Sequence, residues 1–148
     1  MVVIGRNTFV KEIPYLRKLL DPSFSKFVIA GTLGFLIDGG LLIILMDLDW
    51  DISISRACSF LSAVSATFII NRTWTFETKG RRTLRLEYAY YFSTQLAGAG
   101  INLSVFFLFL YFYPKFQDFP LIPFAFGAGI AMIFNYLISK KFIFIHDP

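Results

Sequence analysis

The sequence predicts an all-α membrane protein with four transmembrane helices in a single domain, and three observations support this. Of its 148 residues, 56% are hydrophobic and 16% are charged, whereas soluble domains carry about 25% charged residues. Four apolar runs are long enough to cross a hydrocarbon core of ~30 Å, which takes about 20 helical residues. Because the bilayer offers no water to backbone groups, each run is expected to be a helix.

The four spans are expected at about residues 27–46, 53–70, 87–111 and 121–138. Before the first span, apolar and basic residues occupy opposite sides of a stretch in which Pro14 fits a first helical turn. This pattern fits a short interfacial helix or an unstructured basic tail. The first 23 residues lack the early apolar region of a signal peptide.

The distribution of positive charge predicts the orientation. Four spans place both termini and the middle loop on one side, and this side carries 12 of the 14 lysines and arginines. The opposite side carries only Arg56 and Lys115. By the positive-inside rule both termini are cytoplasmic, so we expect a multi-pass protein of the cytoplasmic (inner) membrane.

The chain also repeats itself. A shift of 64 places Gly31, Gly34 and Asp38 on Gln95, Gly98 and Asn102, and a shift of 68 places Arg72, Trp74 and Phe76 on Lys140, Phe142 and Phe144. Each unit is then a two-helix hairpin that ends in a basic-x-aromatic-x-Phe sequence. Two spans per unit make this a parallel repeat, related by an axis along the membrane normal.

Polar residues within the spans are candidates for function or for packing. Asp38 lies within the hydrocarbon, where a carboxylate is protonated, paired or faces a wet cavity; a pair with Arg56 and a proton-coupling or hydroxyl-binding site both fit. Gln95 and Asn102 suit hydrogen bonds between helices at least as well as a ligand. Small and polar faces, including Gly31, Gly34, Gly98 and Asn135, predict tight packing of the four helices around a narrow, mildly polar centre.

The ends of spans two and four carry basic and aromatic side chains, in "NRTWTF" and "SKKFIF". Trp74 suits the headgroup level, and Arg72, Lys140 and Lys141 can extend to the interface as membrane anchors. The same cations form part of a basic ring that would attract anionic lipid headgroups. A phosphate-bearing lipid is therefore a chemically natural ligand, although topological signalling alone would produce this charge bias.

The residues of catalytic and metal sites are scarce. The chain has one histidine, His146, and one cysteine, Cys58, too few for a metal cluster of these ligands or a disulfide. It contains no GxxxxGK[ST] phosphate loop. We therefore expect a protein that is not an enzyme and has no cofactor, metal or nucleic-acid partner.

Three stretches, "FVIAGTLGFLIDGGLLIIL", "FLSAVSATFIINRTWTF" and "GAGIAMIFNYLISKKFIF", resemble the GtrA-like family of small four-helix membrane proteins linked to cell-surface polysaccharide synthesis. The resemblance spans residues 23–144, and its most specific elements are Gly31, Gly34 and Asp38 and the sequence Asn71-Arg72-x-Trp74-x-Phe76. The second tail departs from the family pattern, with Lys140 and Lys141 where arginine is common and Phe142 where tryptophan is.

The resemblance implies translocation of a polyprenyl-phosphate-linked sugar, or support of the glycosyltransferase that makes or uses it. Our hypothesis from the residues is that Arg72 and Lys140 hold the lipid phosphate, helped by Lys26 or Arg85. The sugar hydroxyls would meet a set of polar side chains along the path, namely Asp38, Gln95 and Asn102. A homodimer that uses the glycine stripe as its interface would be the simplest way to build a pathway.

Two other functions remain open at this level. An accessory subunit of a membrane glycosyltransferase would use the loop of residues 73–87 and would need its intramembrane polar residues only for folding. A small proton-coupled exporter of cations is suggested by the single acidic residue in the first span. The basic ring at the cytoplasmic side argues against that exporter because it would repel cations.

Overall fold

The computed structural model describes residues 21–78 and 82–144, whose regular elements are helical throughout. Among these residues, four helices are long and apolar enough to cross a membrane, namely α2 (Pro22–Asp47), α3 (Ile52–Ile70), α4 (Leu84–Phe112) and α5 (Leu121–Ile138). This confirms the predicted all-α membrane protein with four spanning helices. The interfacial helix predicted before the first span falls outside the described residues.

Both hairpins end in an extra turn of unusual type. A π-helical turn, η2 (Asn71–Thr75), continues α3, and a second one, η4 (Ser139–Ile143), continues α5. A short 3-10 turn, η3 (Pro114–Asp118), lies between α4 and α5. With the earlier starts of α2 and α4, these turns extend all four helices past the predicted spans at the same end. The predicted spans stopped near the first cations because the hydropathy falls there, but the helices continue past these cations.

Local sequence explains where the first hairpin begins and turns. Asp21 caps α2 by accepting a hydrogen bond from the Ser23 amide at 2.9 Å, and Pro22 occupies the first helical position. Asp51 caps α3 in the same way, accepting from Ser53 N at 2.8 Å and Ile54 N at 3.2 Å. Between the two helices, Asp49 has a φ of 58°, a left-handed conformation that aspartate tolerates better than most residues.

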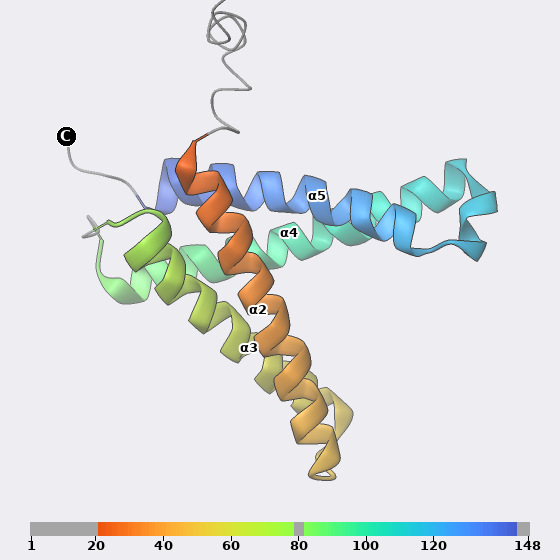
Figure 1. Ribbon diagram of the computed structural model, residues 1–148, viewed down its shortest axis with the longest axis horizontal. Coiled ribbons are helices and arrows are strands. Elements are labelled where there is room, and N and C mark those ends of the chain that lie inside the picture. Colours follow the sequence, from red (N-terminus) through yellow and green to blue (C-terminus); the bar gives the residue numbers. More distant parts are fainter. Residues whose placement is uncertain (1–20, 79–81, 145–148) are drawn as a thin grey trace, which may run out of the picture.

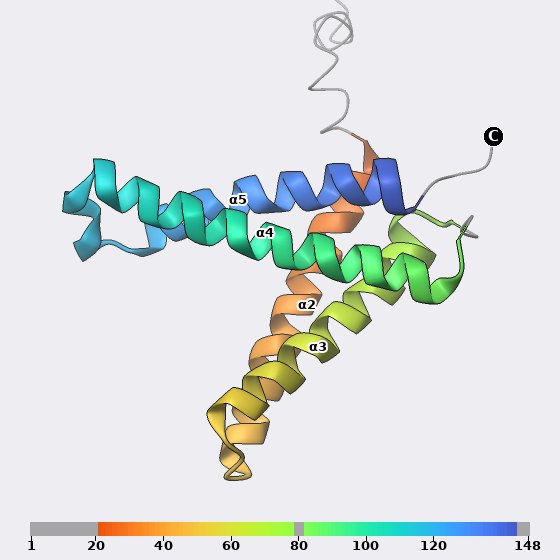
Figure 2. The same ribbon diagram turned by 180° about the vertical axis from the view of Figure 1, so that it is seen from behind.

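The helices form two hairpins that meet at one end and diverge from it. Figures 1 and 2 show α2 beside α3, and α4 beside α5, with the hairpins crossing close to η2, η4 and the starts of α2 and α4. Helices touch along their lengths within each hairpin, and contacts between hairpins are concentrated at the shared end. Both hairpins therefore start from the same side, as a parallel repeat requires. The placement of this end in the cytoplasm stays a prediction.

The predicted tight packing of four helices around one polar centre is wrong, because the small faces are used inside each hairpin. A Cβ added to Gly34 would lie 2.3 Å from the Thr67 side chain, and a Cβ added to Gly98 would lie 2.3 Å from the Asn135 side chain. At Gly31 an added Cβ would meet nothing within 4 Å. Close approach at the first two glycines serves pairing within each hairpin.

Candidate functional site

The two π turns close with the same kind of hydrogen bond at equivalent places in the repeat. The Phe76 amide donates to the Asn71 carbonyl at 2.9 Å, and the Phe144 amide donates to the Ser139 carbonyl at 2.8 Å. Each hydrogen bond spans five residues, and the two turns are related by the shift of 68. Single π turns are rare and occur frequently at functional sites. Their pairing at the shared end makes that end the first place to look for function.

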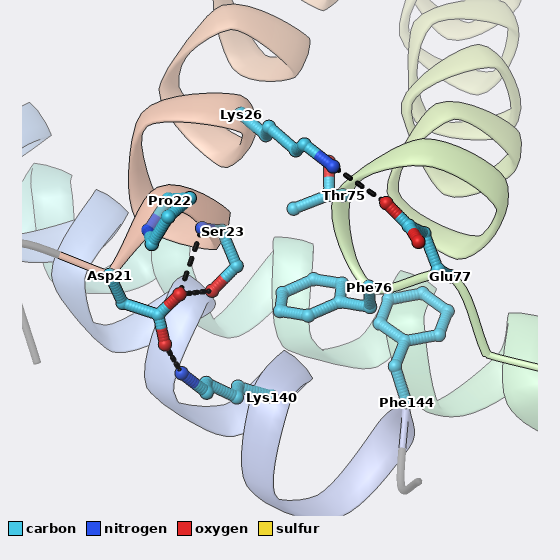
Figure 3. Close-up of a pocket in the computed structure, with 9 residues that line it drawn as sticks. All are labelled: Asp21, Pro22, Ser23, Lys26, Thr75, Phe76, Glu77, Lys140 and Phe144. Atoms are coloured by element: carbon cyan, nitrogen blue, oxygen red, sulfur yellow. Dashed lines mark hydrogen bonds and ion pairs between the residues drawn. The ribbon is translucent and has the colours of Figure 1, made fainter.

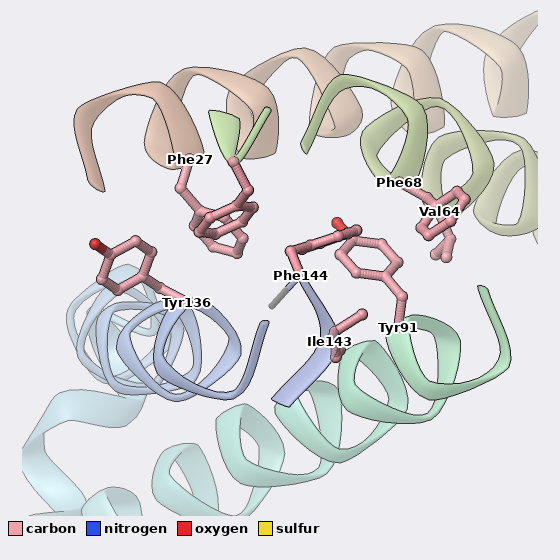
Figure 4. Close-up of a cluster of buried hydrophobic side chains, with 8 residues drawn as sticks. Phe27, Val64, Phe68, Tyr91, Tyr136, Ile143 and Phe144 are labelled. Carbon is pink, nitrogen blue, oxygen red and sulfur yellow. The ribbon is translucent and has the colours of Figure 1, made fainter. Parts of the chain in front are cut away.

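An aromatic cluster joins the hairpins, and we call it the junction. It consists of Phe27, Val64, Phe68, Phe76, Tyr91, Tyr136, Ile143 and Phe144 (Figure 4). At its centre Phe76 stacks on Phe144, the equivalent residue of the other unit, with ring centroids 5.0 Å apart and planes inclined by 20°. Such pairs contribute about 0.5–1.5 kcal/mol each beyond area burial.

The surrounding ring pairs repeat as a two-fold axis through this stack requires. Phe27 of α2 packs on Tyr136 of α5 at 5.6 Å, and the equivalent Tyr91 of α4 packs on Phe68 of α3 at 5.5 Å. The internal repeat therefore folds into an approximately two-fold symmetric junction. Asn71 lies within it and donates to the Tyr91 hydroxyl at 2.8 Å, so this predicted ligand residue is a packing partner here.

The repeat-equivalent cations each cross to an acid of the other hairpin. Arg72 Nε lies 2.9 Å from Glu87 Oε2, and Lys140 forms an ion pair with Asp21. The two pairs differ in burial, because the Glu87 side chain is 0% exposed and that of Arg72 is 25% exposed, against 40% for Lys140 and 32% for Asp21. Arg72, predicted as a phosphate ligand, is thus engaged in a buried contact between hairpins.

Asp21 is ionised at neutral pH in this arrangement. Its partial burial acts to raise its pKa, but hydrogen bonds from the Lys140 ammonium and from Ser23 outweigh burial and hold the pKa below its ordinary value. The Lys140 ammonium also donates to the Tyr136 hydroxyl at 3.1 Å. Lys140 is therefore fixed by two oxygen atoms and keeps one further N–H to offer.

A second pair of cations caps the π turns. Lys26 Nζ donates to the Trp74 carbonyl at 3.0 Å and to Glu77 Oε1 at 2.7 Å. In the other unit, Arg82 donates to the carbonyl of Phe142, the residue equivalent to Trp74. Helix C-termini leave carbonyls without intrahelical donors, and a cation satisfies one such carbonyl in each unit.

A cavity of about 500 Å³ opens on the Lys140 side of the junction. It is lined by Asp21, Pro22, Ser23 and Lys26, by Thr75, Phe76 and Glu77, and by Lys140 and Phe144 (Figure 3). We call it the junction pocket. Lys140 and the exposed Lys141 also border a second cavity of about 440 Å³.

One lining side chain of the junction pocket has an unmet hydrogen bond. Thr75 is 4% exposed, and its Oγ1 has no hydrogen-bond partner among the described residues. Buried hydroxyls are normally hydrogen-bonded, so this donor is an exception at the wall of the pocket. Its equivalent in the other unit is Ile143, which needs no partner.

The polar residues of the spans pair within their own hairpins. Arg56 Nη1 donates to Asp38 Oδ2 at 2.7 Å in the first hairpin. In the second, Asn135 Nδ2 donates to Gln95 Oε1 at 3.1 Å, and an added Cβ on Gly127 would lie 2.4 Å from Asn102 Oδ1. The hairpins diverge, so Asp38 is separated from Gln95 and Asn102 within one chain, and a path that all three residues line stays a prediction.

The remaining predicted site residues lie on the surface of this end. Trp74 is exposed, with its ring centroid 5.7 Å from the Lys26 ammonium. Lys141 is exposed, with its ammonium 5.2 Å from the Phe142 ring centroid. Within residues 21–78 and 82–144, no three His, Cys, Asp or Glu side chains are grouped as metal ligands would be.

Sequence reasoning missed Asp21 and Glu87, the acids that pair with the repeat-equivalent cations. Both stand at the start of the first helix of a unit, but they are not equivalent under the shift of 64, which maps Glu87 to Ser23. A signal was nevertheless present, because an acid at the edge of an apolar run needs a cation nearby.

A comparison with known families finds one whose match covers both hairpins and the junction. The family model described as GtrA/DPMS, transmembrane domain, matches residues 26–144. The match begins at Lys26 and ends at Phe144, so it includes both π turns and the Phe76–Phe144 stack.

Proposed function

The chain belongs to the GtrA/DPMS transmembrane-domain family, and we propose that it moves a polyprenyl-phosphate-linked sugar across the membrane. Membership associates it with the membrane proteins of polysaccharide and glycoconjugate synthesis. In our proposal the junction faces the cytoplasm and receives the lipid headgroup, and the protein acts without catalysis.

The observation that carries the proposal is the junction pocket. It brings two lysines, Lys26 and Lys140, to one cavity of about 500 Å³ beside the unpartnered Thr75 hydroxyl. Each lysine ammonium has three donors, so it can keep its carboxylate and still bind a phosphate oxygen. The phosphate site of our proposal therefore shifts from Arg72, which is held by Glu87, to Lys26 and Lys140.

The rest of the lipid would follow the diverging hairpins. Their apolar faces are exposed along the spans, so the isoprenoid tail can remain in the bilayer. Three oxygens in the spans, Asp38 Oδ1, Asn102 Oδ1 and Asn135 Oδ1, are buried without a hydrogen-bond partner in the part of the chain that the structure describes, and they can accept from sugar hydroxyls. We propose that a second copy of the chain encloses this path, with Gly31 on the enclosed face.

The ion pair of Asp38 argues against a proton-coupled exporter. Asp38 accepts a hydrogen bond from Arg56 at 2.7 Å, so the acid that suggested proton coupling already has a counter-ion. An accessory subunit of a glycosyltransferase remains the second candidate, because it would present the same basic end to a partner. Lipid binding at the junction pocket separates it from the proposed translocation.

The test is lipid retention by native mass spectrometry on purified protein. Undecaprenyl phosphate glucose and phosphatidylglycerol would be compared in the wild type, Lys26→Ala and Lys140→Ala. Lys115→Ala is the matched control, because Lys115 is an exposed lysine at the opposite end of the second hairpin. We expect the wild type and the control to retain the glucose lipid selectively, and we expect Lys26→Ala and Lys140→Ala each to lose it.

Equal retention of both lipids in all four proteins would contradict a headgroup site. The next experiment would then be capture of a glycosyltransferase through the exposed cations of this end. Selective retention would instead lead to a vesicle assay, in which movement of undecaprenyl phosphate glucose between leaflets should require both Lys140 and Asp38.

A further inference from the structure

The junction pocket holds two negative groups as well as two positive ones. Its ionisable side chains are Asp21, Lys26, Glu77 and Lys140, so their formal charges sum to zero. A site built only to attract anionic lipid would gain from net positive charge, at about 1 kcal/mol per cation near the surface. The carboxylates are therefore a feature that phosphate binding alone leaves unexplained.

Both carboxylates are held at the pocket by specific contacts. Asp21 Oδ1 accepts from the amide and the hydroxyl of Ser23, each at 2.9 Å, and Oδ2 accepts from Lys140. Glu77 Oε1 accepts from Lys26 at 2.7 Å. Each carboxylate oxygen can accept two hydrogen bonds, so Asp21 Oδ2 can accept one more from a ligand donor. The Glu77 side chain is 64% exposed, so a ligand can reach it.

The backbone of Glu77 points to a function rather than to a relaxed loop. Its φ is 50°, a left-handed conformation in which a glutamate is uncommon. Residues held in such conformations cost of order 1–3 kcal/mol and cluster at ligand-binding sites. In this conformation the Glu77 carboxylate contacts Lys26 at 2.7 Å.

The two forms of a polyprenyl carrier differ in charge and in hydrogen-bond donors. A bare polyprenyl phosphate is a phosphomonoester, and such groups carry about −1.5 to −2 charges at neutral pH. A glycosyl ester of the same phosphate has lost one ionisable oxygen, so it carries a single charge, and its sugar brings several hydroxyl donors. Carboxylates repel the first form more strongly and can accept hydrogen bonds from the second.

We propose that Asp21 and Glu77 make the junction pocket selective for the singly charged, hydroxyl-rich glycosyl phosphodiester over the bare phosphomonoester. The two lysines bind the phosphate, and the two acids accept hydrogen bonds from the sugar. The pocket then admits the loaded carrier and rejects the empty one, which prevents the empty carrier from competing for the site. This inference rests on the proposed function and adds its selectivity.

The experiment measures a ratio of two lipids with the same tail. Undecaprenyl phosphate glucose and undecaprenyl phosphate would be offered together to the full chain, and their relative retention would be read by native mass spectrometry. The test variant is Asp21→Asn with Glu77→Gln, because asparagine still caps a helix and both changes keep the shape. Asp118→Asn, an exposed acid in η3, is the matched control.

We expect the wild type and Asp118→Asn to favour the glucose lipid by at least about fivefold. The double variant should retain the bare phosphate better by about fivefold per charge removed, and so should lose or reverse the preference. A ratio measured on one preparation is insensitive to any fraction of the protein that fails to fold.

Two outcomes would overturn the inference in different ways. If the wild type retains both lipids equally, or the double variant keeps the wild-type ratio, the acids do not select and only the selectivity is refuted. If Lys26→Ala and Lys140→Ala change the retention of neither lipid, the pocket is not the headgroup site. The proposed function then fails together with the inference.

Discussion

The two ion pairs at the junction occupy equivalent places in the repeat, yet one is buried and the other is open. Arg72 meets Glu87, whose side chain is fully buried, whereas Lys140 meets Asp21 at the wall of a cavity. Both pairs connect the end of one hairpin to the start of the other. The acids of the two pairs stand at different places in the repeat. Glu87 is the equivalent of Ser23, whereas Asp21 lies two residues before Ser23.

The difference shows how an internal repeat can divide two tasks between its copies. The Arg72–Glu87 pair can fix the angle between the hairpins, since a buried pair is costly to break. The Lys140–Asp21 pair is then free to exchange contacts with a ligand, since a partly exposed pair contributes little to stability. Four predictions test this division, in order of decreasing expected effect.

Arg72→Ala should destabilise the fold most. Without the guanidinium at 2.9 Å from its oxygen, the buried Glu87 carboxylate loses its compensating charge, which costs about 3–5 kcal/mol for pairs of this kind. Lys140→Ala should cost less than about 1 kcal/mol, because its pair is partly exposed. Unfolding in mixed detergent micelles, followed by circular dichroism, measures both free energies.

A second variant shows whether buried charge is the cause. Adding Glu87→Gln to Arg72→Ala removes the unpaired carboxylate and should restore part of the lost free energy of unfolding. Similar losses for Arg72→Ala and Lys140→Ala would contradict the assigned division of tasks, whatever the effect of the glutamine.

Adding a hydroxyl at Ile143 and removing the hydroxyl at Thr75, the equivalent position, should have opposite effects on stability. Ile143→Thr places a hydroxyl where isoleucine is 3% exposed, and an unpaired buried hydroxyl costs about 1–3 kcal/mol. Thr75→Val removes a hydroxyl that has no hydrogen-bond partner among the described residues, so it should leave the unfolding free energy unchanged or raise it. The same valine variant should retain undecaprenyl phosphate glucose less well.

The result that would break this comparison is a stability loss at Thr75→Val equal to that at Ile143→Thr. The Thr75 hydroxyl would then be a structural group, and the pocket would lose its clearest sign of a ligand.

Much of the fold was predictable because the burial of apolar side chains in the bilayer depends mainly on the length and hydropathy of each segment. Length and hydropathy locate all four spans, and the repeat of Arg72 and Phe76 in Lys140 and Phe144 identifies the two units. The alternative in which Asp38 pairs with Arg56 was also visible, since both belong to the same half of one hairpin. These features depend on composition and local spacing.

The junction was not predictable because it depends on contacts between hairpins. Spacing along one chain does not reveal that Arg72 reaches Glu87, the first residue of the predicted third span. A π turn differs from an α turn in closing its hydrogen bond over five residues instead of four, and propensity gives no signal for it. The predicted polar centre was wrong since Gly34 and Gly98 each face a partner inside the same hairpin.

Replacing the partly exposed ion pair by a copy of the buried pair should weaken lipid binding at the junction pocket. Ser23→Glu with Lys140→Arg recreates the Glu87 and Arg72 pair at the equivalent positions and adds one negative charge to the pocket. One charge near the surface is worth about 1 kcal/mol, so retention of undecaprenyl phosphate glucose should fall about fivefold in native mass spectra.

Lys140→Arg alone is the matched control for this rebuilding. It keeps the charge and a donor for phosphate, so it should retain the lipid as the wild type does. If the double variant also binds like the wild type, the glutamate does not occupy the pocket and the two sides are less alike than the aromatic junction indicates.

The smallest expected effect is the pH dependence of the open pair. The pKa of Asp21 is lowered from its ordinary value of 3.8, so its stabilising contribution is complete above that pH. The contribution disappears as the pH falls through the lower pKa of the folded state. Because the pair is partly exposed, the contribution should stay below about 1 kcal/mol.

The measurement is the difference in unfolding free energy between the wild type and Asp21→Asn. It should be constant between about pH 5 and pH 7 and should shrink below about pH 4. A difference above about 2 kcal/mol would place this pair in the range of buried ion pairs. The Lys140–Asp21 pair would then hold the hairpins together as Arg72–Glu87 does, and a ligand could not recruit Lys140 without loosening the junction.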